Sequence, residues 1–219
     1  MALAITPTDT KPRLRGWLHL AAFPTAVIAG LLLIATAPTL TGRLATAVYV
    51  ATSAALFGIS ALYHRTSLSE RATTRLKRLD HANIYLIIAG TYTPIATLAL
   101  DGTARTALLT AIWTGALAGV AFRTLWLGAP RWLYTVLYIA LGWAALFVMP
   151  QLLAGAGTTA TALIITGGLL YTAGGLIYAL KRPNPSVQWF GFHEVFHACT
   201  IAAYAAQFTA VALVIHSAS

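Results

Sequence analysis

The chain has 219 residues, of which 58% are hydrophobic and only 9% are charged, and its mean hydropathy is +0.76. These values lie far outside those of soluble domains, so the composition excludes a soluble globular protein and places the chain in a lipid bilayer. The formal net charge is +9, but the basic residues fall between apolar runs and form no basic face, so the charge does not indicate nucleic-acid binding.

Seven apolar runs are each long enough to cross the hydrocarbon core of a bilayer, which takes about 20 helical residues. Short segments with turn and charge signals separate them. The runs lie at residues 18–38, 44–64, 79–99, 106–126, 132–149, 159–180 and 191–216. The first run is too long for the apolar core of a signal peptide, so we interpret it as a helix. We predict an all-α fold, in which an N-terminal tail at 1–17 precedes a single seven-helix transmembrane domain at 18–216.

The basic residues predict the orientation of this bundle. On alternate sides of the seven runs, one side has Lys11, Arg13, Arg15, Arg65, Arg71, Arg75, Lys77, Arg78, Arg123, Arg131, Lys181 and Arg182. The other side has only Arg43 and Arg105. Basic residues near the ends of membrane spans stay in the cytoplasm. We therefore expect a multi-pass protein of a bacterial-type inner membrane, with its N-terminus in the cytoplasm and its C-terminus outside.

Polar residues in three of the runs need a separate explanation, because ionisable groups inside a membrane are costly. Ser60 and His64 end the second run, Asp80 opens the third, and His193 and His197 open the seventh. The spacing of four residues within each pair places both members on one helix face. The second run leads towards the cytoplasm, whereas the third and seventh lead away from it. All five residues are therefore predicted to lie at one membrane depth.

Three imidazoles that meet inside a bundle suit Zn²⁺, which catalytic sites bind through three protein ligands and a water. The predicted metal ligands are His64, His193 and His197. Asp80 would bind the metal directly or, as we favour, hold and deprotonate its water, with Ser60 as a hydrogen-bond partner. His81 is turned by about 100° from Asp80 on a helix, so we expect it to face elsewhere.

The sequence His193-Glu194-x-x-His197 also matches the H-E-x-x-H signature of zinc proteases, in which the glutamate is the general base. This alternative would make the chain an intramembrane metalloprotease. Such enzymes take a further carboxylate ligand from another helix, and no acidic residue follows Glu194. Glu194 has a simpler interpretation as a solvated residue, or as part of the entrance to the site.

Four motifs resemble the hemolysin III branch of the progestin and adipoQ receptor family, which includes the adiponectin receptors. They are Ser60-x-x-x-His64, Leu79-Asp80-His81-Ala82, Ala89-Gly90-Thr91-Tyr92-Thr93-Pro94 and Gly191-Phe192-His193-Glu194-Val195-Phe196-His197. The resemblance extends from the first predicted helix to the last. It implies seven helices with the N-terminus inside and zinc held by His64, His193 and His197. It also implies that Asp80 acts through a metal-bound water, with Ser60 beside it.

The wider superfamily includes alkaline ceramidases, so the resemblance also suggests an activity. Our leading hypothesis is a zinc-dependent hydrolase of a ceramide-like lipid amide, with a membrane lipid as its substrate. The alternative is a non-enzymatic sensor or receptor, or a pore-forming hemolysin, with a structural zinc site. Structural zinc is normally held by four protein ligands, so direct coordination by Asp80 would favour that alternative.

Overall fold

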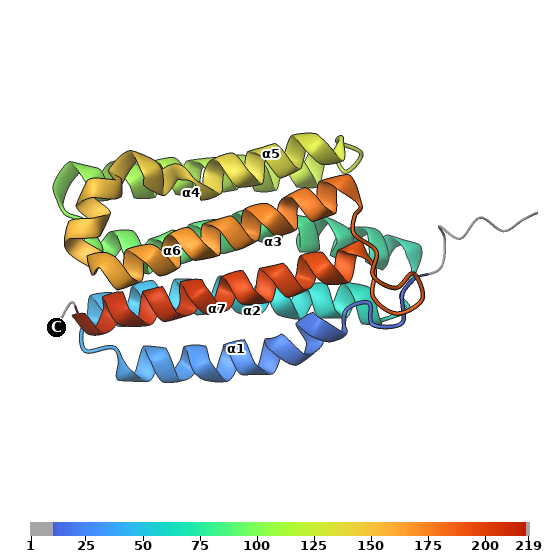
Figure 1. The fold of residues 1–219 in the computed structure, drawn as a ribbon, viewed down its shortest axis with the longest axis horizontal. Coiled ribbons are helices and arrows are strands. Elements are labelled where there is room, and N and C mark those ends of the chain that lie inside the picture. Colours follow the sequence, from blue (N-terminus) through green and yellow to red (C-terminus); the bar gives the residue numbers. More distant parts are fainter. Residues whose placement is uncertain (1–10, 218–219) are drawn as a thin grey trace, which may run out of the picture.

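The computed structural model describes residues 11–217, so the first ten residues of the predicted tail lie outside the described part. All secondary-structure elements of the described chain are helices, which confirms the all-α class. The elements are α1 (Trp17–Thr36), α2 (Leu40–Arg65), α3 (Glu70–Ala99), α4 (Gly102–Leu125), α5 (Arg131–Gly142), the 3₁₀ helix η1 (Ala144–Val148), α6 (Met149–Leu180) and α7 (Phe192–Ser217). The helices lie roughly parallel or antiparallel in one bundle (Figure 1).

The outer surface of the bundle is apolar. Phe147 and Leu125 are 90% and 85% exposed, and large aliphatic side chains also cover the outer faces of α1 and α2. Water would not tolerate so much contiguous apolar surface, whereas lipid does. The described residues contain six helical stretches that are long and apolar enough to cross a membrane.

Between the fifth and sixth runs we expected a connection at about residues 150–158, and the structure interrupts the helix there. Pro150 lies in the first turn of α6, where no backbone N–H has an intrahelical acceptor, so a proline is tolerated. Gly157 interrupts α6 with a φ of 79° and a ψ of 167°, a non-helical conformation that glycine adopts without strain. The chain turns back in this first part of α6, so that α5 and the rest of α6 run antiparallel (Figure 1). Residues 131–180 count as a single stretch among the six.

Close helix contacts hold the central elements together. An added Cβ on Gly90 of α3 would lie 1.9 Å from the Thr52 hydroxyl oxygen on α2. An added Cβ on Gly155 of α6 would lie equally close to the Ala99 carbonyl oxygen at the end of α3. Glycine lets helix backbones approach this closely within a membrane. These contacts fix α3 against α2 and α6.

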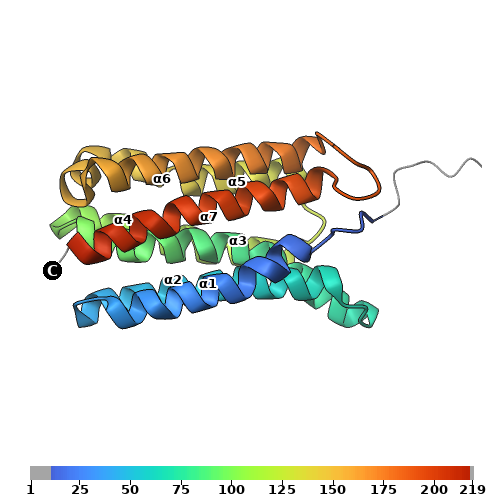
Figure 2. The same cartoon turned by 60° about the horizontal axis from the view of Figure 1, so that its bottom comes forward.

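The order of the helices brings three helix termini to one end of the bundle. Helix α7 packs against α6, α3 and α1, and α2 packs between α1 and α3. The last turn of α2, the first half of α3 and the first turn of α7 lie at the end where α1 begins (Figure 2). Helix α7 finishes at the opposite end. The polar residues singled out in the sequence lie at the shared end.

Candidate metal centre

Three histidines from two helices converge at this end of the bundle. The side chains of His64, His193 and His197 each offer a ring nitrogen, and these nitrogens all lie within 4.8 Å of one another. The Nε2 atoms of His64 and His193 are 3.2 Å apart. Two nitrogens bound to one tetrahedral zinc ion at about 2.0–2.1 Å would be about 3.3 Å apart. The spacing therefore suits a shared metal ion.

Local helix geometry explains this convergence. His64 lies in the last turn of α2, and His193 and His197 lie one turn apart at the start of α7. Both α7 imidazoles face His64, with ring centroids 4.8 Å and 5.4 Å from it. Gly16, just before α1, packs directly on the His64 side chain, where an added Cβ would lie 2.6 Å from the His64 Cβ. The spacing of four residues in the sequence thus produces the geometry expected of it.

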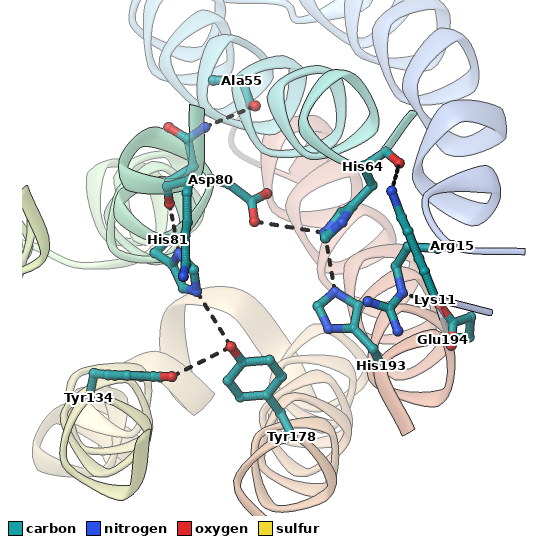
Figure 3. Close-up of polar contacts among 12 residues, drawn as sticks. Lys11, Arg15, Ala55, His64, Asp80, His81, Tyr134, Tyr178, His193 and Glu194 are labelled. Atoms are coloured by element: carbon teal, nitrogen blue, oxygen red, sulfur yellow. Dashed lines mark hydrogen bonds and ion pairs between the residues drawn. The ribbon is translucent and has the colours of Figure 1, made fainter. Parts of the chain in front are cut away.

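Asp80 lies beside the three histidines and not among them. Its Oδ2 is 3.9 Å from His64 Nε2 (Figure 3). This distance is too long for a direct hydrogen bond, but a metal ion or a water to one side of the two atoms could contact both. Ser60 is buried one turn before His64, and its hydroxyl is a hydrogen-bond partner of the Asp80 carboxyl. The structure therefore brings together all five residues singled out by the sequence.

Glu194 is buried, so its interpretation as a solvated residue is wrong. Its side chain is only 1% exposed and forms an ion pair with Arg15. Its second carboxylate oxygen accepts a 2.8 Å hydrogen bond from the Gly191 N–H. Both oxygens are thus engaged: one anchors the start of α7 to the segment before α1, and the other holds the backbone just before α7. These contacts argue against Glu194 as the general base of a protease.

The segment before α1 crosses the same end of the bundle. Lys11 Nζ donates a hydrogen bond to the His64 carbonyl oxygen at 2.6 Å (Figure 3). The Arg13 N–H donates to the Gln188 carbonyl oxygen at 2.9 Å, which joins this segment to the α6–α7 connection. Partial burial, with the positive charge of two nearby arginines, lowers the pKa of Lys11. The part of the predicted tail from residue 11 onwards therefore covers the metal centre.

His19 is a further histidine at the site, and it was not among the predicted metal ligands. It is buried, and its ring stacks on that of His197 with centroids 3.7 Å apart and planes 7° apart. The Phe57 ring contacts the His19 ring in an edge-to-face arrangement. Neither nitrogen of His19 has a hydrogen-bond partner within residues 11–217. The stacking restricts the ring of His197 to one orientation.

His81 turns away from Asp80, as expected, but it remains at the same cavity. Its side chain points towards the Tyr178 hydroxyl, and the Tyr134 hydroxyl lies beside that of Tyr178 (Figure 3). All three side chains line the cavity that also contains Asp80 and His193. The sequence did not single out the two tyrosines, because aromatic residues near the ends of membrane helices are common at the lipid interface.

A long apolar cavity extends from the histidines into the bundle. Its lining on α7 runs from His193 to Gln207, which is about 21 Å along a helix. Beyond the metal end, aliphatic and aromatic side chains of α3, α5 and α6 surround it with a few threonines and Gln207, and Leu108 and Leu152 line its far part. Such a site suits a long apolar chain with one polar end.

Comparison with known proteins identifies the family. The family described as Haemolysin-III related matches residues 8–208, which include every residue of the metal centre. The chain belongs to the haemolysin III family. It is similar to the Hemolysin-3 homolog of Bacillus subtilis (strain 168), with 32% identity over 145 residues that cover 63% of this chain and 68% of that protein. It is also similar to Hemolysin-3 of Bacillus cereus, with 34% identity over 104 residues that cover 48% of each chain.

Membership of the haemolysin III family agrees with the apolar bundle. With its membrane-spanning helices, the chain is a multi-pass membrane protein. The three clustered histidines of this family member, two of them buried and His193 partly exposed, could hold a metal ion at one end of the bundle.

Proposed function

We propose that this haemolysin III protein is a zinc-dependent hydrolase of a ceramide-like lipid amide. One arrangement carries the proposal. The nitrogens of His64, His193 and His197 lie within 4.8 Å of one another, and the Asp80 carboxylate lies beside them at the mouth of a long apolar cavity. A three-histidine metal site also occurs in proteins with other functions. The carboxylate beside it and the apolar cavity are the two features that a lipid hydrolase needs in addition.

Zinc suits the donor set better than other metals. Neutral imidazoles are good zinc ligands, and catalytic zinc sites use three protein ligands with one position left open. Calcium and magnesium prefer oxygen ligands, which the three histidines do not supply. When bound, zinc acts as a Lewis acid that polarises a carbonyl group and lowers the pKa of a coordinated water towards about 7.

The residues around the histidines have defined roles in this proposal. Asp80 accepts a proton from the attacking water and returns it to the leaving nitrogen as the amide C–N bond breaks. Ser60 holds the Asp80 carboxyl in position through its hydrogen bond. The cavity binds the acyl chain and keeps bulk water away from the carbonyl group. Each cycle consumes one water and releases a fatty acid and an amine.

We further infer that the chain crosses an inner membrane seven times, with its N-terminus in the cytoplasm. Twelve of the 14 Lys and Arg residues belong to the side on which the N-terminus lies. The antiparallel course of α5 and α6 (Figure 1) supports two crossings in residues 131–180. The metal centre would then lie at the cytoplasmic leaflet. Labelling of single cysteines at position 43 and position 182 tests this orientation, since only the former should react from outside.

The names of the Bacillus relatives favour a second candidate, which is lysis of membranes by a protein with a structural metal. A pore needs a continuous polar lining, whereas the cavity here is mainly apolar. A sensor or receptor would need no such lining. A structural site would use the Asp80 carboxylate as a fourth ligand, whereas the hydrolase needs that carboxylate to contact a metal-bound water, so the ligands of the metal decide between them.

Replacing Asp80 tests the hydrolase directly. Purified wild type and Asp80→Ala are compared for zinc content and for release of fatty acid from long-chain N-acyl amides. We expect the variant to keep its zinc and lose at least about 100-fold in turnover, a typical effect for a general base. Turnover equal to that of the wild type would exclude this mechanism. Zinc lost together with the activity would instead make Asp80 a metal ligand.

A further inference from the structure

Three polar side chains from three helices meet in the cavity next to the metal centre. His81 comes from α3, Tyr178 from α6 and Tyr134 from α5 (Figure 3). His81 Nε2 lies 3.4 Å from the Tyr178 hydroxyl oxygen, which lies 3.5 Å from the Tyr134 hydroxyl oxygen. We call these three residues the His81 cluster. The proposed hydrolysis does not use any of them.

The hydrogen bonds around His81 define what it offers to the cavity. Its Nδ1 lies 2.7 Å from the Lys77 carbonyl oxygen, which can only accept, so Nδ1 carries a proton. Nε2 of the neutral ring is then an acceptor that points towards Tyr178. The Tyr138 hydroxyl donates to the His81 backbone carbonyl at 3.1 Å and holds this part of α3 in place. The cavity therefore contains a fixed acceptor next to two hydroxyl donors.

The contacts within the cluster are weak, so a ligand hydroxyl in the cavity beside them can replace them. Hydrogen bonds from a hydroxyl usually measure about 2.5–3.0 Å, so both contacts of the Tyr178 hydroxyl are weak. A polar group that is buried without a good partner is destabilising, because it has lost its hydrogen bonds to water. A ligand hydroxyl placed here would donate to His81 Nε2 and accept from a tyrosine. It would relieve that destabilisation.

The charges around the cluster favour a neutral ligand group. Arg123 lies over the Tyr134 ring at 4.3 Å and Arg131 over the Tyr178 ring at 4.8 Å. A cation on the ring face strengthens the phenol as a donor and disfavours a cationic ligand. Asp80 is the only acidic residue among the described residues that line the cavity, and neither arginine lines it. A phosphate would therefore lack a direct counter-charge, and the one carboxylate that could pair with an ammonium group, that of Asp80, points towards His64 and away from the cluster (Figure 3).

The position of the cluster relates it to the reacting bond. Asp80 and His81 are consecutive, and their side chains diverge towards His64 and Tyr178 respectively (Figure 3). The Tyr178 ring also contacts the His193 ring, with centroids 5.7 Å apart. A hydroxyl a few bonds from a carbonyl group at the histidines would reach the cluster. The acyl chain would extend the other way, into the apolar part of the cavity.

We propose that the His81 cluster binds a neutral hydroxyl group on the amine part of the lipid amide and so makes the site selective for hydroxylated substrates. This inference rests on the proposed hydrolase function. His81, Tyr178 and Tyr134 are positioning residues in it, since they fix the amide relative to Asp80 and take no part in the proton transfers.

The test compares two substrates that differ in one hydroxyl group. Full-length, zinc-loaded protein in lipid nanodiscs hydrolyses a long-chain N-acyl ethanolamine and the N-acyl ethylamine with the same acyl chain. We expect kcat/KM to be about 2- to 12-fold higher for the ethanolamide, since a hydrogen bond contributes about 0.5–1.5 kcal/mol and each 1.36 kcal/mol is tenfold in rate. In Tyr178→Phe this ratio falls towards one while zinc content stays the same. Tyr171→Phe, a matched change of another tyrosine that lines the cavity, keeps the ratio.

The outcomes separate this inference from the hydrolase proposal. Equal hydrolysis of both amides by the wild type, or an unchanged ratio in Tyr178→Phe, would overturn the inference and leave the hydrolase standing. If the wild type hydrolysed neither amide, the hydrolase proposal would be contradicted. Equilibrium binding of the same two lipids would then test the His81 cluster by itself. Tighter binding of the ethanolamide that is lost in Tyr178→Phe would support the His81 cluster. Equal binding of both lipids would exclude it.

Discussion

His64 and His193, which are 129 residues apart in the chain, face each other through their Nε2 atoms at 3.2 Å. A neutral imidazole carries one proton, and two facing nitrogens form a hydrogen bond only if one of them holds it. A third imidazole, that of His197, has a nitrogen within 4.8 Å of both. A shared cation satisfies three such lone pairs at once, and this is the reason to treat the cluster as a metal centre.

Removing one ligand is expected to remove the metal. His64→Ala should lower the zinc content from about one ion per chain to a small fraction of that, because two imidazoles bind zinc far more weakly than three. His216→Ala, at the other end of α7, is the control and should keep its zinc. Elemental analysis of both purified variants checks this. Full zinc content in His64→Ala would show that the ion lies elsewhere.

Ser60 is expected to affect the rate more than the metal. Its hydroxyl positions the Asp80 carboxyl, and loss of such a supporting hydrogen bond typically costs about 10–100-fold in activity or metal affinity. Ser60→Ala should therefore reduce kcat by about 10-fold with most of the zinc retained. Thr91→Ala serves as the control, since that hydroxyl donates to a backbone carbonyl within α3. An unchanged kcat in Ser60→Ala would remove the serine from the mechanism.

Glu194 is expected to stabilise the fold and to play no part in proton transfer. Arg15→Ala would leave a buried carboxylate without its partner, which typically costs about 3–5 kcal/mol. Arg13→Ala, which removes an exposed arginine stacked on Trp189, should cost much less. Thermal unfolding in detergent compares the two variants.

Activity separates this structural role from the protease alternative. Glu194→Gln should keep most of the lipid hydrolysis at temperatures where it stays folded. If the Glu194→Gln protein were folded and zinc-loaded but inactive, the result would support Glu194 as the general base.

The His19 ring is expected to hold the His197 ring in place by stacking on it, and not by binding the metal. His19→Phe keeps an aromatic ring against His197 and should retain zinc, whereas His19→Ala leaves a void and should weaken zinc binding. Competition with a chelator measures both affinities. If His19→Phe lost zinc as completely as His197→Ala, His19 would be a ligand and not a support.

The sequence predicted the histidine cluster because helical spacing and alternating helix direction are both local rules. His64 and His193 could be matched in depth without knowing how the helices pack. The role of Glu194 could not be predicted, since its partner Arg15 lies 179 residues away in a segment with no helical pattern. The turn between α5 and the rest of α6 was predicted from the turn signals between Pro150 and Thr158. Only the helical form of residues 149–156 was not, because proline is tolerated in the first turn of a helix.

The His81 cluster shows a second limit of prediction from sequence. The angular offset between Asp80 and His81 correctly separated their directions. It could not show that α5 and α6 place two tyrosines opposite His81, in the same cavity as Asp80. Only the packing of three helices brings those hydroxyl groups together.

X-ray absorption at the zinc edge, combined with elemental analysis of protein purified without chelators, tests the metal centre most directly. We expect about one zinc ion per chain, with three imidazole nitrogens at about 2.0–2.1 Å and one oxygen. A folded protein without zinc, or a zinc spectrum without histidine scattering, would contradict a metal held by His64, His193 and His197.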